Sequence, residues 1–149
     1  MVKRISILAL LIFIVFSASP QEDPGFILPP CAILNASLRG DEAMVRLILE
    51  LGTEKDVATS LGDTALHLAV YQENLNVVWL LLEHGFDPNA VNHMGNTPLH
   101  NAVTANNENA ARLLLQYRAN RDIRNNDGVS PLDKARREGK TQLVYLFYR

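Results

Sequence analysis

The feature that most constrains this chain is a repeat with a period of 33 residues. Gly62, Gly95 and Gly128 follow one another at this step, and their neighbours keep it. The aligned positions include Thr64, Thr97 and Ser130, then Leu66, Leu99 and Leu132, then Ala69, Ala102 and Ala135. Self-similarity at such a period indicates stacked units, because one unit cannot bury its apolar faces alone.

Each unit is predicted to contain two short helices and a turn. Thr64 is placed to cap the first helix with its hydroxyl. A second helix is expected from Leu75 to His84, with an apolar surface wide enough to pack against neighbours on both sides. Gly85 would end this helix in a left-handed conformation. The chain then turns out and back into the next unit.

Weaker copies are expected at both ends of the array. One period before Gly62, the residues Ala36, Gly40, Leu49 and Gly52 fall on the repeated positions. The last unit ends inside its second helix. Terminal repeats are commonly atypical because one side meets solvent or a linker. The predicted repeats are therefore residues 29–59, 60–92, 93–125 and 126–149.

Two strings identify the repeat, namely Gly62-Asp63-Thr64-Ala65-Leu66-His67-Leu68-Ala69 and Gly95-Asn96-Thr97-Pro98-Leu99-His100-Asn101-Ala102. They resemble the ankyrin repeat in period and in order, and the resemblance covers residues 29–149. It implies an all-α solenoid of helix-turn-helix units with short connecting turns. It also implies that His67 and His100 tie the start of each inner helix to neighbouring turns by hydrogen bonds.

Some positions depart from the family pattern. Arg118 replaces the glycine that ends an outer helix, while Glu73 and Asn106 replace a glycine between two helices. A residue with a side chain in the left-handed conformation costs on the order of 1 kcal/mol. The turn of the third repeat is therefore expected to be less rigid.

The N-terminal segment differs from the rest of the chain. Lys3 and Arg4 precede the apolar run Ile5–Phe16, which small and polar residues follow. This order is typical of a secretory signal. A run of that length spans a membrane poorly, since about 20 apolar residues are needed. We predict a signal peptide at residues 1–19 and a linker at 20–28, with a retained membrane anchor as the alternative.

The ankyrin resemblance implies binding of a protein on the concave side, formed by the turn tips and the exposed edge of the inner helices. By register, the positions predicted to bind are Ser60, Leu61, Asp63, Tyr71, Gln72, His93, Met94, Asn96, Thr104, Ala105, Asn126, Asp127, Val129, Arg137 and Glu138. Leu61, Met94 and Tyr71 are the expected anchors, since exposed apolar and aromatic groups carry interface energy. Lone exposed apolar residues are also normal on protein surfaces.

Catalytic and metal-binding patterns are sparse. The sequence has four histidines and one cysteine, Cys31, with no His-x-x-x-His or Cys-x-x-Cys spacing for zinc. It has no glycine-rich phosphate loop and no Gly-x-Ser-x-Gly elbow. We expect no enzyme activity, no metal and no cofactor. Cys31 matches Thr64 in register, which favours a structural role, although an unpaired cysteine can also join two chains.

Charge is distributed unevenly along the chain. Residues 18–111 contain 3 basic and 12 acidic residues, a balance of −9, whereas residues 112–149 contain 9 basic and 4 acidic residues, a balance of +5. The basic end could steer an acidic partner or an anionic membrane surface. Solvated faces explain such charges more often. Trp79 falls on the convex face, where a cation–π pair with Arg112 is the expected arrangement.

These observations favour an exported, monomeric, non-enzymatic module that binds one protein partner. Inhibitor or immunity protein, adaptor of an envelope enzyme, and secreted effector all stay open within this class. Export to a periplasm or to the outside argues against nucleic acid as the target, and a membrane surface is a secondary possibility. The rival hypothesis is a membrane-tethered scaffold that retains Ile5–Phe16 as its anchor.

Overall fold

A computed structural model describes residue 29 and residues 31–148. Within this part of the chain, eight α-helices form four pairs, one pair in each of the four ranges expected from the repeat. The helices are α2 (Ala32–Arg39), α3 (Glu42–Leu51), α4 (Ala65–Tyr71), α5 (Leu75–Glu83), α6 (Pro98–Thr104), α7 (Glu108–Gln116), α8 (Pro131–Arg137) and α9 (Thr141–Phe147). The predicted all-α solenoid is confirmed.

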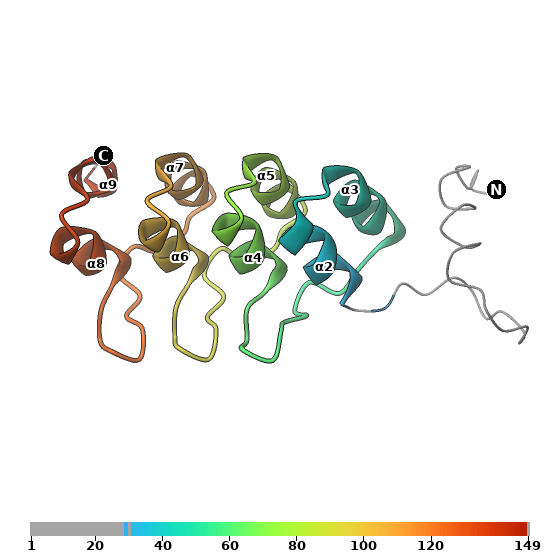
Figure 1. The fold of residues 1–149 in the computed structure, drawn as a ribbon, viewed down its shortest axis with the longest axis horizontal. Coiled ribbons are helices and arrows are strands. Elements are labelled where there is room, and N and C mark those ends of the chain that lie inside the picture. Colours follow the sequence, from blue (N-terminus) through green and yellow to red (C-terminus); the bar gives the residue numbers. More distant parts are fainter. Residues whose placement is uncertain (1–28, 30, 149) are drawn as a thin grey trace, which may run out of the picture.

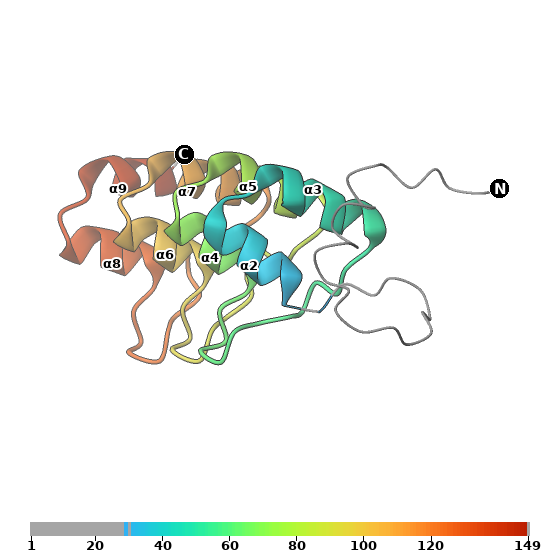
Figure 2. The same cartoon turned by 45° about the vertical axis from the view of Figure 1, so that its right-hand side comes forward.

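The helix pairs stack side by side in two rows (Figure 1). The inner helices α2, α4, α6 and α8 form one row, and the outer helices α3, α5, α7 and α9 form the other, an arrangement that is also visible in Figure 2. Long loops precede α4, α6 and α8, and all of them project to the same side of the rows. Equivalent positions of successive repeats therefore lie next to each other.

Side-chain caps explain where helices α3 to α8 begin. Thr97 and Ser130 hydroxyls accept hydrogen bonds from backbone N–H groups of α6 and α8, and Thr64 holds the same place before α4. The outer helices α3, α5 and α7 are preceded by the N-caps Asp41, Asn74 and Asn107, whose side chains accept from the N–H groups of Met44, Val77 and Ala110. Each cap satisfies a backbone donor that the helix itself leaves open.

The outer helix α5 ends one residue before the predicted His84, which instead follows it as the C-cap. Gly85 then adopts the left-handed conformation with φ 78°, as expected. Glu73, Asn106 and Arg118 also have positive φ, at 58°, 55° and 65°. These three residues therefore adopt the left-handed backbone conformation that is expected where the family pattern has glycine. The rigidity of the third turn stays a prediction.

The core runs through the centre of the stack. Helix α5 is buried on most of its circumference, through Val77, Val78, Leu80, Leu81 and Leu82. On the inner helices the small side chains at the repeated alanine position are fully buried, which lets neighbouring inner helices approach closely; these are Ala69, Ala102 and Ala135. Burial of apolar surface between repeats is the main stabilising contribution.

The predicted signal peptide at residues 1–19 and the linker at 20–28 lie outside the described residues. Among the residues that are described, no helix combines the length and the apolar character needed to cross a membrane.

Candidate functional site

The tips of the projecting loops are joined to one another by hydrogen bonds. The N–H of His93 donates to the carbonyl of Leu61 at 3.0 Å, and one repeat later the N–H of Asn126 donates to the carbonyl of Met94 at the same distance. The side chain of Asn126 also donates to the carbonyl of His93, at 2.9 Å. The structure thus brings predicted tip residues of three repeats together in one continuous row.

A second set of bonds links the bases of the loops. Asn92 Nδ2 donates to Asp63 Oδ1 at 2.8 Å, and Asn125 Nδ2 donates to Asn96 Oδ1 at 2.9 Å. Asp63 and Asn96 are half-buried. Their side chains therefore hold neighbouring loops together, and a partner would meet them as part of a fixed surface.

Two buried histidines connect the loops to the inner helices. His67 Nδ1 accepts from the N–H of Thr64, while Nε2 lies 2.9 Å from the carbonyl oxygen of Asn96. His100 repeats this arrangement with Thr97 and with the carbonyl of Val129. Because a carbonyl oxygen can only accept, Nε2 carries the hydrogen in both rings. The predicted structural role of the two histidines is thus visible in their contacts.

Burial lowers the pKa of both imidazoles. Desolvation disfavours the charged ring and is the largest cause for His67 and for His100. The hydrogen bonds to the carbonyls of Asn96 and Val129 raise the pKa and offset part of this effect. Both rings therefore favour the neutral form that their two hydrogen bonds require.

The remaining predicted residues lie at the C-terminal ends of the inner helices. Tyr71, Thr104 and Arg137 are the last residues of α4, α6 and α8, and each is exposed. The residues that follow them, Gln72, Ala105 and Glu138, are the C-caps of the same helices. The loop tips and these helix ends together are called the inner surface below.

Three apolar side chains on the inner surface are well exposed. Leu61 and Tyr71 are each 67% exposed, and Met94 is 60% exposed. The structure adds a fourth, Leu38 of α2, which is 43% exposed and stands one period before Tyr71. The 33-residue register places Leu38 at the position of Tyr71, but the first repeat matches the pattern too weakly to predict its surface. On the inner surface the exposed large apolar residues therefore lie in the first three repeats.

Half-buried positions on the inner helices connect the loop tips with the helix ends. Leu68, Asn101 and Lys134 lie three residues before Tyr71, Thr104 and Arg137, and so share their helix faces. They were also missed by the sequence reasoning. At this position the inner surface is apolar in α4 (Leu68), polar in α6 (Asn101) and basic in α8 (Lys134).

The charged end of the inner surface is engaged in internal ion pairs. Glu138 contacts the ammonium groups of Lys134 and Lys140, each at 2.8 Å, and the hydrogen bonds from these two lysines lower the pKa of Glu138. Lys140 also donates to the carbonyl of Thr104 at 3.0 Å. Among the described residues Arg137 forms no ion pair, which leaves it available to an acidic group.

The expected cation–π pair of Trp79 with Arg112 is wrong. Among the described aromatic residues, the cation–π contact is that of Arg136 with the ring of Tyr148, at 5.6 Å. Trp79 lies near Tyr117 of the next repeat, and Tyr117 donates its hydroxyl hydrogen to Glu83. This hydrogen bond to Glu83 raises the pKa of Tyr117, against an opposing effect of Trp79. Within the described residues Trp79 therefore forms no cation–π pair with Arg112.

Cys31 and the possible metal ligands do not form a reactive cluster in the described part of the chain. Cys31 is exposed at the N-cap of α2 and its thiol is free. In the part of the chain that the structure describes, three or more His, Cys, Asp or Glu side chains do not gather in a metal-binding group.

Of the predicted inner-surface residues, Ser60, Gln72, His93, Asn126 and Asp127 are exposed, while Ala105 and Val129 are half-buried.

Comparison with protein families agrees with this architecture. The family model described as ankyrin repeats (3 copies) matches residues 5–92, and the model described as ankyrin repeats (many copies) matches residues 81–135. The chain belongs to the ankyrin-repeat family. Ankyrin repeats act as protein-interaction modules. The first match starts inside the segment predicted to be a signal peptide, and none of the curated proteins compared matches the chain.

Proposed function

We propose that this ankyrin-repeat protein binds one protein partner on its inner surface and performs no chemical conversion. The observation that carries the proposal is the group of exposed apolar side chains Leu38, Leu61, Tyr71 and Met94 on loops and helix ends that hydrogen bonds hold in place. Such a preformed surface loses little conformational freedom on binding. The exposed aromatic and apolar groups would supply most of the interface energy.

The proposal includes export of the protein, with residues 1–19 as a signal peptide and the repeats acting in a periplasm or outside the cell. Its support is the order of the N-terminal residues, in which a basic pair precedes the apolar run Ile5–Phe16. Inhibitor or immunity protein, envelope-enzyme adaptor and secreted effector are the roles that fit an exported binding module.

The binding surface is tested with a partner identified by pulldown on the unmutated protein. The dissociation constant is then measured for Tyr71→Ala/Met94→Ala and for the control Trp79→Ala/Tyr145→Ala on the outer helices. We expect the first pair to weaken binding by about 30-fold or more, as loss of interface anchors does. Equal affinity of the first variant and the unmutated protein would disprove the proposed surface.

The alternative is a membrane-tethered scaffold that retains Ile5–Phe16. Mass spectrometry of the mature N-terminus distinguishes the two. A start near Ala18 in the soluble fraction supports export with cleavage. An intact Met1 in the membrane fraction contradicts it and supports the tether.

A further inference from the structure

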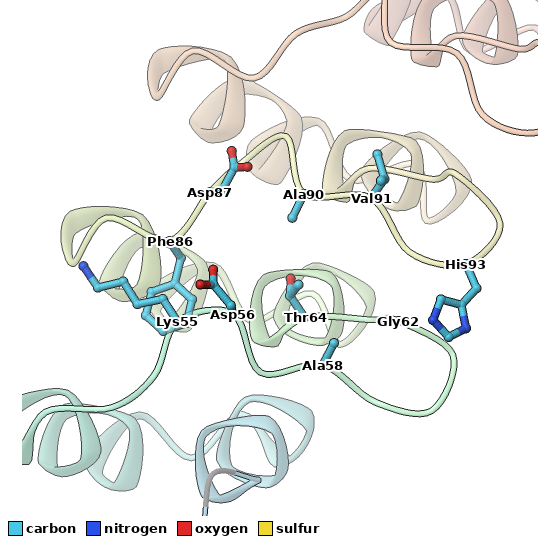
Figure 3. Close-up of a pocket in the computed structure, with 10 residues that line it drawn as sticks. All are labelled: Lys55, Asp56, Ala58, Gly62, Thr64, Phe86, Asp87, Ala90, Val91 and His93. Atoms are coloured by element: carbon cyan, nitrogen blue, oxygen red, sulfur yellow. The ribbon is translucent and has the colours of Figure 1, made fainter.

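The apolar end of the inner surface stands on closely packed loop tips. A Cβ atom on Gly62 would lie 2.7 Å from Cδ2 of His93 and 2.8 Å from its backbone nitrogen. Figure 3 shows the His93 ring beside Gly62, at the tips of the loops that precede α4 and α6. Leu61 and Met94 are the sequence neighbours of these two residues, so their side chains extend from backbone that has little room to move.

The opposite end of the inner surface, at α8, carries an excess of positive charge. Glu138 lies 2.8 Å from the ammonium groups of both Lys134 and Lys140. Arg137 is exposed on the same helix, and within the described residues it has no ion pair. Three positive charges against one negative charge leave a balance of +2 at this end, and the one carboxylate is already shared by two lysines.

Two titratable groups respond to this positive charge. The hydrogen bonds from Lys134 and Lys140 lower the pKa of Glu138, so its carboxylate stays ionised and paired. Burial is the largest cause that lowers the pKa of His100 in the neighbouring repeat, and the charge of Lys134 lowers it further. The positive charge of α8 therefore acts towards α6, whose exposed and half-buried residues carry no charge that opposes it.

The α2 end of the inner surface has no such excess. Arg39 is exposed beside Leu38, but Asp41 follows two residues later and balances its charge. An acidic group is thus attracted to α8, whereas apolar groups find their contacts in the first three repeats. Such an asymmetry fixes the direction in which a partner binds.

The spacing of the helices gives the distance between the two kinds of contact. Packed helices lie about 8–10 Å apart, so α4 and α8 are separated by about 20 Å. A helix of a partner covers this distance in about 13 residues. A single segment of a partner can therefore reach both the apolar end and the basic end.

We propose that the partner carries an acidic side chain that pairs with Arg137 while its apolar side chains contact Tyr71 and Met94. This inference rests on the proposed function, because it assigns a chemistry to the partner of the same inner surface. A carboxylate can accept two parallel hydrogen bonds from a guanidinium group, which gives direction as well as affinity. A partner without this carboxylate would cover Arg137 and leave its charge unpaired, which weakens binding.

The test selects ligands on the immobilised full chain from a phage-displayed library of random peptides of about 16 residues, long enough to span both ends as a helix. We expect the selected peptides to combine apolar residues with Asp or Glu. Fluorescence anisotropy then compares each peptide with a version in which the acidic residue is replaced by its amide. The amide version should bind the unmutated protein about 10-fold more weakly, and the two versions should bind Arg137→Gln equally within about twofold.

Arg136→Gln is the matched control. Arg136 is the neighbouring residue of α8, is exposed and contacts the ring of Tyr148, so its replacement removes the same charge outside the inner surface. The preference for acidic peptides should stay about 10-fold in this variant. Selected peptides without acidic residues, or a preference that survives Arg137→Gln, overturn the inference. A preference that is lost in Arg39→Gln instead overturns it as well.

The Tyr71→Ala/Met94→Ala variant separates this inference from the proposed function. If it weakens binding of the selected peptides while Arg137→Gln has no effect, the inner surface is the binding surface and the acidic contact is wrong. If neither variant changes the affinity, the peptides bind elsewhere, and both the inference and the proposed function are contradicted.

Discussion

Nε2 of His67 donates a hydrogen bond of 2.9 Å to the carbonyl of Asn96, at the base of the loop of the next repeat. The same ring accepts from the N–H of Thr64 through Nδ1. One buried side chain thus joins the start of α4 to the neighbouring repeat and so couples the two repeats.

Replacing His67 by alanine is expected to destabilise the fold by about 3 kcal/mol. The change removes both hydrogen bonds, leaves buried backbone groups unpaired and opens a cavity. Urea unfolding followed by circular dichroism measures the loss. His84→Ala is the matched control, because His84 is exposed at the end of α5 and its loss should cost less than about 1 kcal/mol. Equal losses in the two variants would contradict the coupling role.

The free energy of unfolding should fall as the pH drops below about 6.5, the ordinary pKa of histidine. Burial lowers the pKa of His67 and His100 in the folded state, so the unfolded chain binds more protons in this range. The free energy of unfolding therefore rises with pH in this range. The contribution of the two neutral histidines is fully present above the pKa that they have in the unfolded chain. With two sites the slope can reach at most about 2.7 kcal/mol per pH unit.

Denaturant unfolding at several pH values between 5.5 and 8 measures this slope. The control is His67→Asn, which should show a clearly smaller slope. The pKa values of the Asp133 and Glu138 carboxyl groups are lowered, so these groups change the free energy of unfolding only at more acidic pH. A flat profile between pH 5.5 and 7 would rule out the two histidines as its source.

Ser37→Val is expected to stabilise the protein by about 1–2 kcal/mol. The Ser37 hydroxyl is buried in α2, and within the described part of the chain it has no hydrogen-bond partner. Val70 and Val103 occupy the same position in the next two repeats. Removing an unpaired buried polar group and adding apolar contact both favour the folded state.

Thermal unfolding compares Ser37→Val with Ser130→Ala. The Ser130 hydroxyl accepts from the N–H of Asp133 at the start of α8, so its loss should cost about 1 kcal/mol. The two serine variants should therefore shift the midpoint in opposite directions. A lowered midpoint for Ser37→Val would show that the packing around this residue does not accept the larger side chain.

Arg118→Gly should raise the free energy of unfolding by about 1 kcal/mol. Arg118 has φ 65°, a conformation that glycine adopts without a steric penalty. Arg112→Gly is the matched control inside α7, where glycine costs about 1 kcal/mol. Chemical denaturation of both variants measures the difference, and a loss of stability in Arg118→Gly would show that its side-chain contacts outweigh the strain.

Much of the fold was predictable because its signals are local and recur at a fixed spacing. Thr64, Gly85 and His67 each have a conformational or hydrogen-bonding reason for their place in the repeat. The register also indicated which residues point outward, such as Tyr71 and Met94. Whether these residues contact a partner stays a prediction.

The incorrect prediction concerned a contact between side chains of different repeats. The register placed Trp79 and Arg112 at matching positions, but matching positions do not determine how two side chains of neighbouring repeats are oriented, and the described residues show no cation–π contact between them.

The row of hydrogen bonds between the loop tips also determines how the molecule should respond to mechanical load. Each of these bonds joins a loop to its immediate neighbour, as those of Leu61 with His93 and of Met94 with Asn126 do. Stability in such an array is a sum over adjacent units. When the two ends are pulled apart, the repeats should therefore yield in succession, with a small extension at each step.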